Sequence, residues 1–365
     1  MHTTPQRIGV LTAGGDCPGL NAVIRSVVKS AAGVGIQVFG IENGFMGLVE
    51  DHVRPLALGD VSNILTRGGT ILGSHNKCNP SKLAVKGADG KLVFADRRDD
   101  CMATLARHNI EALVVIGGDG SMSAAAQFIA RGVRCVGVPK TIDNDLMGTD
   151  ITFGFSTAVH VGAEALDRVH TTASSHHRVM LVELMGRNAG WIALHAGVAS
   201  GADVILIPEI PYRVEAVADK IRSRHAKGKG YTIIAVGEGA KPAGGLQTIR
   251  RLDPSSPDPV RLGGVSEQLA EQLEAMTGIE ARATVLGYVQ RGGTPVAEDR
   301  ILGTAFGHAA VNLILAGQFD RMVVRQKGEL TSIPILEVAH KQRMIPLDHP
   351  LLAAAKAVGV SFGEM

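Results

Sequence analysis

The chain has 365 residues and a net charge of +2, and its residues are 45% hydrophobic and 20% charged. This length suits two domains, and the balanced charge excludes strong binding to nucleic acid or to a membrane surface. No stretch of about 20 apolar residues could span a bilayer. Gly14, Gly15 and Asp16 interrupt any signal peptide before a long apolar region forms. Four cysteines without CxxC spacing indicate reduced thiols, so we expect a cytoplasmic enzyme.

Short apolar runs recur along the chain, and each ends in glycine or in a polar turn. They begin at residues 7, 111, 134, 178, 202, 231 and 281. Four to six consecutive apolar residues are typical of strands that are buried on both faces. Helical patterns follow the first two runs, from Leu20 and from Ser121. This alternation predicts an α/β fold with mostly parallel sheets, in which ligands bind at the carboxyl ends of the strands.

Three regions lack such features. Residues 241–264 are rich in proline, glycine and serine, so we expect a long surface excursion there. Residues 73–92 are a second region that we expect to be irregular, and they carry positive charge. Beyond Gly317 the chain contains no diagnostic motif.

Two glycine-rich turns, GGDCPGLN from Gly14 and GGDGS from Gly117, each follow a predicted strand and open a predicted helix. Glycines let the backbone approach a ligand, and the free amides at a helix N-terminus bind phosphate. Asp119 could hold a Mg²⁺ ion that carries nucleotide phosphates. An ordinary tight turn and a helix-capping aspartate would explain the same residues. Because the chain has two such turns, we favour phosphate binding.

The stretch VGVPKTIDNDLMGTD places Asp143 and Asp145 directly after a predicted strand. One carboxylate could accept a proton from an attacking hydroxyl while its neighbour restrains it. A surface turn built from Asp and Asn would show the same pattern. Because Asp119 and Arg187 follow neighbouring strands, we favour catalysis, with Mg²⁺ and arginines offsetting the repulsion between the two carboxylates.

Arginines also follow or flank the apolar runs. Arg187 ends a predicted strand, where a guanidinium could stabilise the charge on a transferring phosphoryl group. Arg178, Arg282 and Arg291 could form an anion pocket or be separate surface charges. The paired histidines of SSHHR lack a third and fourth ligand at metal spacing, so we expect no structural metal there.

The ordered motifs resemble those of the 6-phosphofructokinase family over about residues 7–303: GGDCPGLNAVIR, RGGTILGS, VVIGGDGS, PKTIDND, GFSTAV, SSHHR, MGRNAGW, GADVILIPE and VLGYVQRGGTP. The resemblance implies two Rossmann-like three-layer αβα domains with the active site in the cleft between them. It implies a donor-binding domain of residues 1–154 and about 290–340. Residues from about 155–289 and 341–365 would bind fructose 6-phosphate. The implied glycolytic reaction transfers the γ-phosphoryl group of MgATP to the C1 hydroxyl of that sugar phosphate.

The resemblance also implies roles for individual residues. Asp143 would be the general base, supported by Asp145, with Thr141 against the transferring phosphoryl group. Asp119 would serve Mg²⁺, and Arg187 would stabilise the transition state. The donor site would further contain Gly15, Lys77, Gly120 and Ser121. The sugar-phosphate site would further contain Ile142, Arg178, Met185, Gly186, Glu238, Arg282, Tyr288, Val289, Gln290 and Arg291.

The family pattern implies a homo-oligomer, a dimer or a tetramer, in which Arg178 and Arg282 act across the subunit interface. Two positions depart from the pattern. Tyr288 stands where many relatives have histidine, and it cannot become cationic near neutral pH. Lys77 stands where many have arginine, and it keeps the charge but loses the bidentate geometry.

Two residues bear on the phosphoryl donor, which is either ATP or pyrophosphate in this family. Gly120 is typical of ATP users, because a side chain there would occupy the space of the nucleotide α-phosphate. Lys140 is typical of pyrophosphate users. We favour ATP, since a steric block is harder to evade than an added cation, and we keep pyrophosphate as the alternative.

Other classes of protein explain less of the sequence. An enzyme like NAD kinase or diacylglycerol kinase would explain GGDG, but not TIDND, MGR and QRGG together. A dinucleotide oxidoreductase would need GxGxxG with an acid about 20 residues on, and neither glycine turn matches. A noncatalytic paralogue that binds sugar phosphate is disfavoured because Asp119, Asp143, Asp145 and Arg187 are all present.

Overall fold

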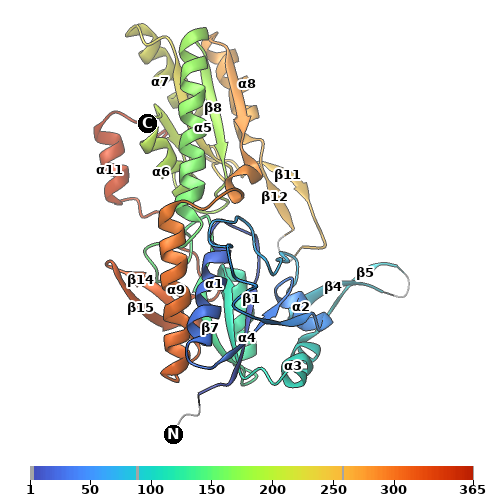
Figure 1. Cartoon of the computed structure of the whole chain (residues 1–365). Helices are drawn as coiled ribbons and strands as arrows, with labels where there is room; N and C mark the ends of the chain where they lie inside the picture. The colour runs from blue at the N-terminus through green and yellow to red at the C-terminus, as the bar shows by residue number, and fades with distance from the viewer. Residues whose placement is uncertain (1–3, 88–89, 257–258, 365) are drawn as a thin grey trace.

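The seven predicted apolar runs form strands in two separate sheets of the computed structural model, which describes residues 4–87, 90–256 and 259–364 (Figure 1). The runs that begin at residues 7, 111 and 134 lie in the larger sheet. The other four make up the smaller sheet. The predicted α/β fold with mostly parallel sheets is therefore confirmed. No helix among the described residues is long and apolar enough to cross a membrane.

The larger sheet has seven strands in the order β15-β14-β7-β6-β1-β2-β3. They are β1 (Arg7–Thr12), β2 (Gln37–Ile41), β3 (Val53–Leu56), β6 (Ala112–Gly117), β7 (Arg134–Pro139), β14 (Arg321–Gln326) and β15 (Glu329–Pro334). The five central strands are parallel, whereas each edge strand runs antiparallel to its neighbour. The sequence did not indicate the four outer strands.

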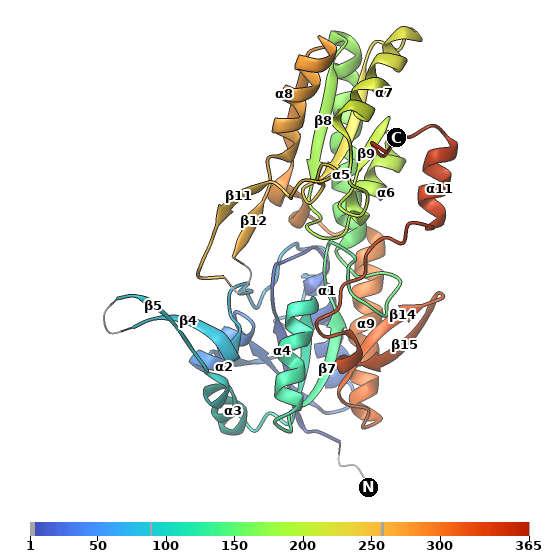
Figure 2. The ribbon, with the colours of Figure 1, turned by 180° about the vertical axis from the view of Figure 1, so that it is seen from behind.

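Helices cover both faces of this sheet (Figures 1 and 2). On one face, α1 (Leu20–Ala32) packs against α9 (Ala297–Leu315), and Gly307 lets them approach, since a Cβ atom there would lie 2.7 Å from the Val23 carbonyl oxygen. The other face carries α2 (Phe45–Glu50), α3 (Arg98–Arg107), α4 (Asp119–Ile129) and α10 (Ile335–Val338). Ile8 and Val10 point to the first face and Leu11 to the second. Both faces are therefore buried, which explains why the central strands are continuously apolar.

The smaller sheet is entirely parallel, with the order β13-β8-β10-β9. Its strands are β8 (Val179–Leu184), β9 (Val204–Leu206), β10 (Thr232–Gly237) and β13 (Ala281–Val285). Its helices are α5 (Phe155–His176) and α6 (Trp191–Ala199) on one face, and α7 (Val214–Ala226) and α8 (Val265–Thr277) on the other. The core beneath α5 and α6 continues into the core beneath α1 and α9. Leu352 of α11 (Pro350–Ala357) belongs to that same core.

The hairpin that includes part of residues 73–92 corrects the irregular structure expected there, whereas the exposed hairpin of residues 241–264 agrees with the expected surface excursion. Residues 73–92 contain the 3-10 helix η1 (Pro80–Lys82) and β4 (Leu83–Lys86), which pairs with β5 (Leu92–Ala95). Residues 241–264 contain β11 (Ile249–Leu252) and β12 (Val260–Leu262). These strands are mostly accessible to solvent, so they lack the apolar runs that mark the buried ones.

Candidate active site

Three loops meet at one edge of the larger sheet, because they follow the adjacent parallel strands β1, β6 and β7. The Lys140 side chain after β7 reaches the loop after β1, where its Nζ donates a hydrogen bond to the Gly15 carbonyl. A Cβ atom on Gly14 would lie 3.5 Å from both Lys140 Nζ and the Ser121 hydroxyl after β6. The structure thus brings together the two glycine-rich turns and the loop that carries the paired aspartates.

Hydrogen bonds hold the two aspartates in a fixed loop. Thr141 Oγ1 donates to Asp145 Oδ1 over 3.1 Å and accepts from the Asp143 backbone amide over 3.1 Å. Between the aspartates, Asn144 adopts a left-handed conformation with a φ of 51°. The Asn144 side chain accepts from the Thr152 amide over 3.0 Å. These contacts restrain the Asp145 carboxylate and the backbone of the loop around Asp143.

Burial raises the pKa of both Asp143 and Asp145. Asp143 Oδ1 is shut off from solvent and has no hydrogen-bond partner among the described residues. Burial raises the pKa of Asp143, while the positive charges of Arg291 and Lys140 oppose that shift. Burial, followed by repulsion from Asp143, raises the pKa of Asp145 to about 7. Asp119 adds further negative charge near Asp145. A proton or a cation would therefore be favoured here.

Asp119 is the first residue of α4, and its Oδ1 accepts from the Ser123 hydroxyl over 3.5 Å. Burial raises the pKa of Asp119, and hydrogen bonds from nearby backbone amides oppose the shift. Among the described residues, no group of three or more His, Cys, Asp or Glu side chains could hold a metal ion. A cation at Asp119 would therefore depend on ligands from a bound phosphate and from water.

The loops after β13, β8 and β10 meet in the same way at one edge of the smaller sheet. The Gly186 amide donates to Glu238 Oε1 over 3.4 Å. Gln290 is fully buried, and its Oε1 accepts from the Met185 amide over 3.3 Å. Gly186 has a φ of 132°, and a Cβ atom there would lie 2.7 Å from the Ala189 carbonyl oxygen. Only glycine fits this turn.

Glu238 and Arg291 connect the two sets of loops. Burial, followed by repulsion from Asp143, raises the pKa of Glu238 to about 7. Arg291 lies in the 3-10 helix η2 (Gly287–Arg291), and its Nη1 donates to the Asp16 carbonyl over 3.1 Å. Its positive charge acts to lower the pKa of both Asp143 and Glu238, against the effect of burial. The predicted base, a predicted sugar ligand and a predicted phosphate ligand therefore lie within electrostatic reach of one another.

The guanidinium of Arg187 lies against the β11–β12 hairpin. Its Nη1 donates to the Val260 carbonyl over 3.1 Å, and its own carbonyl accepts from Gln247 Nε2 over 2.9 Å. Burial, followed by repulsion from Arg261, lowers the pKa of Arg187. The hairpin lies in residues 241–264, which were predicted only as a surface excursion, so nothing in the sequence indicated these contacts.

Lys77 also contacts this hairpin. Its Nζ lies 2.8 Å from the Ser255 hydroxyl and 3.0 Å from Asp253 Oδ2. Nearby, the Ser74 hydroxyl donates to the Gly14 carbonyl, so the Lys77 loop adjoins the first glycine-rich turn. The structure places Lys77 beside the predicted donor site but pairs it with a carboxylate that the sequence did not indicate.

Four other predicted site residues differ in their exposure. Ile142 is fully buried in the hydrophobic core, so its side chain is not available to a sugar, and only its backbone could line a site. Tyr288 and Val289 are 81% and 60% exposed. A Cβ atom on Gly120 would have no atom of the described residues within 4 Å, so this position faces open space.

Arg178 and Arg282 lie far from these loops. Arg178 precedes β8, and Arg282 pairs in register with the second residue of that strand. Met185 follows the other end of β8, so Arg178 lies about 23 Å from it at about 3.3 Å per residue. Both arginines pair with Glu280. The single chain therefore does not bring them to Asp143.

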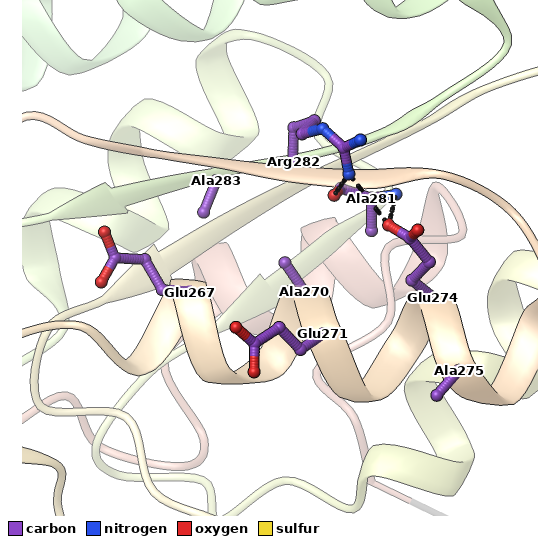
Figure 3. Close-up of a pocket in the computed structure, with 8 residues that line it drawn as sticks. All are labelled: Glu267, Ala270, Glu271, Glu274, Ala275, Ala281, Arg282 and Ala283. Carbon is purple, nitrogen blue, oxygen red and sulfur yellow. Dashed lines mark hydrogen bonds and ion pairs between the residues drawn. The ribbon is translucent and has the colours of Figure 1, made fainter.

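A shallow groove runs between α8 and β13 beside Arg282 (Figure 3). Arg282 Nη1 lies 2.9 Å from Glu274 Oε2 of α8. The groove is lined by Glu267, Ala270, Glu271, Glu274, Ala275, Ala281, Arg282 and Ala283. It lies on the same part of the smaller sheet as Arg282, away from the loops around Asp143.

The chain is similar to proteins of known families. A family model described as phosphofructokinase matches residues 7–314. ATP-dependent 6-phosphofructokinase 2 of Clostridium perfringens is 49% identical over 98% of this chain and 99% of its own length. A pyrophosphate–fructose 6-phosphate 1-phosphotransferase of Amycolatopsis methanolica is 47% identical over 93% of this chain and 96% of its own length.

The fold is similar to solved structures as well. The structure of phosphofructokinase from Saccharomyces cerevisiae matches with a TM-score of 0.75 and 31% sequence identity. The match covers 91% of this chain and 45% of the yeast chain.

Proposed function

Because the chain belongs to the phosphofructokinase family, we propose that it is an ATP-dependent 6-phosphofructokinase. The reaction transfers the γ-phosphoryl group of MgATP to the C1 hydroxyl of fructose 6-phosphate. The observation that carries the proposal is the partnerless, buried Oδ1 of Asp143. This carboxylate is within electrostatic reach of Glu238 after the smaller sheet and of Lys140 after the larger one. A general base that serves a donor and an acceptor on opposite sides needs this placement.

Asp143 is the general base in this proposal. Burial raises its pKa, which makes it a stronger proton acceptor, and the positive charges of Arg291 and Lys140 oppose that shift. The Thr141 hydroxyl links the Asp143 backbone amide to the Asp145 carboxylate, so Asp145 would help to hold the Asp143 backbone in place. The C1 hydroxyl would give its proton to Asp143 as its oxygen attacks the γ-phosphorus.

Asp119 would hold Mg²⁺. The charge on Asp119 adds to that on Asp145, so a divalent cation would relieve a repulsion built into the loops. One carboxylate is enough, since Mg²⁺ takes its other ligands from phosphate oxygens and water. When bound with ATP, the ion would neutralise charge on the phosphates. Gly15 and Ser121 would line the donor site.

Glu238, Met185 and Gly186 would contact the sugar. Glu238 has a pKa of about 7, so its carboxyl group can either donate to or accept from sugar hydroxyls near neutral pH. Arg291 would bind the 6-phosphate. Ile142 through its backbone, with Tyr288, Val289 and Gln290, would complete this side.

Arg187 would stabilise the phosphoryl group in the transition state. To do so, its guanidinium would leave the Val260 carbonyl of the hairpin. A hydrogen bond to a neutral carbonyl is weaker than one to a phosphoryl oxygen, which favours this exchange.

The sites would be completed in a homo-oligomer, either a dimer or a tetramer. Arg178 and Arg282 lie about 23 Å and about 17 Å, measured along the strands, from the loops of their own chain, so they would serve the site of a neighbouring subunit. The groove between α8 and β13 would then lie at or near that interface (Figure 3).

Each of the two sheets would bind one of the two substrates. The larger sheet, with residues 1–154 and about 290–340, would bind the donor, and about 155–289 with 341–365 would bind the sugar phosphate. All four cysteines are unpaired, which supports the proposed cytoplasmic location.

ATP is the proposed donor because Gly120 leaves open space where a side chain would meet the nucleotide. Pyrophosphate is the second candidate. Lys140 and the similarity to the Amycolatopsis methanolica protein favour it. Lys140, however, donates to the Gly15 carbonyl, so part of its binding capacity is already used.

Assays of the purified protein with fructose 6-phosphate and each donor test the proposal. We expect turnover with MgATP and little with Mg-pyrophosphate. Turnover with pyrophosphate but not with ATP would show that pyrophosphate is the donor, with the same acceptor and general base. No turnover with either donor would contradict the proposed function.

A further inference from the structure

Arg343, in the tail that carried no sequence motif, touches the loop that holds Asp143 and Asp145. Its backbone amide donates to the Asp145 carbonyl over 2.7 Å, and Gln342 forms an antiparallel bridge with Leu146. Arg343 Nη1 donates to the carbonyls of Thr149 and Asp150, over 2.8 Å in the second case. The residue therefore grips this loop through both its backbone and its side chain.

The same side chain packs on the loop that follows Arg187. Its guanidinium carbon lies 4.4 Å from the centre of the Trp191 ring, which is almost fully buried. Trp191 Nε1 donates to the Arg343 carbonyl over 3.0 Å. Trp191 begins α6, only four residues after Arg187. Arg343 is thus held between the predicted base loop of the larger sheet and the predicted arginine loop of the smaller one.

Neighbouring residues strengthen the second attachment. Asn188 Nδ2 donates to Gln342 Oε1 over 2.8 Å. The Ile345 amide donates to Glu209 Oε1 over 2.9 Å, and the Glu209 carboxylate also accepts from the Gly190 amide over 3.1 Å. Residues 342–345 therefore bind both ends of the turn between Arg187 and Trp191.

We propose that Arg343 is a positioning residue that fixes the Asp143–Asp145 loop relative to the Arg187 loop. The inference rests on the proposed function, in which one loop removes the proton and the other stabilises the phosphoryl group. Both groups must be placed within a fraction of an ångström for transfer to occur. A planar guanidinium can span two carbonyls and cover an indole ring at once, whereas the point charge of lysine cannot.

Steady-state kinetics of Arg343→Ala, Arg343→Lys and wild type test this inference. We expect Arg343→Ala to lower kcat by about 10- to 100-fold, with KM for both substrates changed by less than about threefold. Arg343→Lys should lose nearly as much. Trp191 is the sole tryptophan of the chain, and its emission should shift to the red in Arg343→Ala as its ring is uncovered.

Arg134→Ala is the matched control. Arg134 also stacks on an aromatic ring, 5.0 Å from the centre of Phe319, and its Nε donates to the Glu111 carbonyl over 3.0 Å. It lies at the amino end of β7, opposite the site. We expect a comparable loss of thermal stability with kcat within about twofold of wild type.

The outcomes separate the inference from the function. A wild type that turns over neither donor contradicts the function. An active wild type with an unchanged kcat in folded Arg343→Ala, or an equal loss of kcat in Arg134→Ala, overturns the inference. If Arg343→Ala does not fold, Gln342→Ala removes the exposed hydrogen bond from Asn188, and it should lower kcat by about three- to tenfold without raising KM. An unchanged kcat in that variant also overturns the inference.

Discussion

Lys77 Nζ lies 3.0 Å from Asp253 Oδ2, so an ion pair joins the loop beside the first glycine-rich turn to the β11–β12 hairpin. A hydrogen bond from Ser255, followed by one from Lys77, lowers the pKa of Asp253 to about 2. The carboxylate therefore stays ionised at neutral pH. In the proposed function, the donor phosphates would compete with Asp253 for Lys77.

Asp253→Asn should therefore improve donor binding, because it releases Lys77. The pair is partly exposed, so the competition is modest, and we expect KM for ATP to fall by about two- to fivefold. KM for fructose 6-phosphate should stay constant. Asp219→Asn, which breaks the exposed pair with Arg222 on α7, should leave both values unchanged. A higher KM for ATP in Asp253→Asn would contradict the competition.

Gly120→Asp should impair the use of ATP. The new side chain would enter open space, so the protein should fold, but its charge would repel the donor phosphates. We expect kcat/KM for ATP to fall by at least about 100-fold, with fructose 6-phosphate affinity changed less than about threefold. Gly59→Asp adds the same charge in open space elsewhere, and it should change neither kcat/KM for ATP nor the affinity for fructose 6-phosphate. A normal kcat/KM for ATP in Gly120→Asp would remove this position from the donor site.

The stability of the ligand-free protein should decrease as the pH rises through the range in which Asp145 titrates. Asp145 has a pKa of about 7 in the folded protein and about 4 when unfolded. The folded state thus binds more protons between these values, and the free energy of unfolding falls as pH rises from about 4 to about 7. Urea denaturation at several pH values measures this slope. Asp145→Asn should flatten it, and an equal slope in that variant would exclude Asp145 as its source.

Mixed oligomers should report whether Arg282 serves another subunit. Asp143→Asn lacks the base and Arg282→Ala lacks the phosphate ligand, so each alone should be nearly inactive. A mixed oligomer would contain some sites with an intact base and an intact arginine from the other chain. Refolding the two variants together should therefore restore a substantial fraction of activity. Activity that stays at the level of the separate variants would place Arg282 in the site of its own chain, or outside any site.

The buried strands were predictable because each lies between two layers of helices and must be apolar throughout. The outer strands were not predictable in this way. β15 and the strands of the β11–β12 hairpin are exposed to solvent, so their residues are mixed in character. Each pairs only with a strand nearby in the chain, so their exposure to solvent explains why no apolar run marks them.

The residues of the site also include some that the sequence indicated and some that it did not. Asp119 and Asp143 follow adjacent buried strands of the larger sheet, so its strand order brings these segments together, and Glu238 follows a buried strand of the smaller sheet. Asp253 and Arg343 lie in the hairpin and in the C-terminal tail. Asp253 contacts Lys77, and Arg343 contacts the loop of Asp145, although these partners are distant in the sequence. No local sequence pattern indicates such contacts.

The exchange of Asp143 for asparagine tests the central claim most directly. Asparagine keeps the shape of the side chain but cannot take the proton from the sugar hydroxyl. Asp150→Asn, an exposed position in the same loop, serves as the control. We predict that kcat of Asp143→Asn falls by about 10²- to 10⁴-fold while fructose 6-phosphate still binds. A kcat within about tenfold of wild type in the folded variant would contradict Asp143 as the general base.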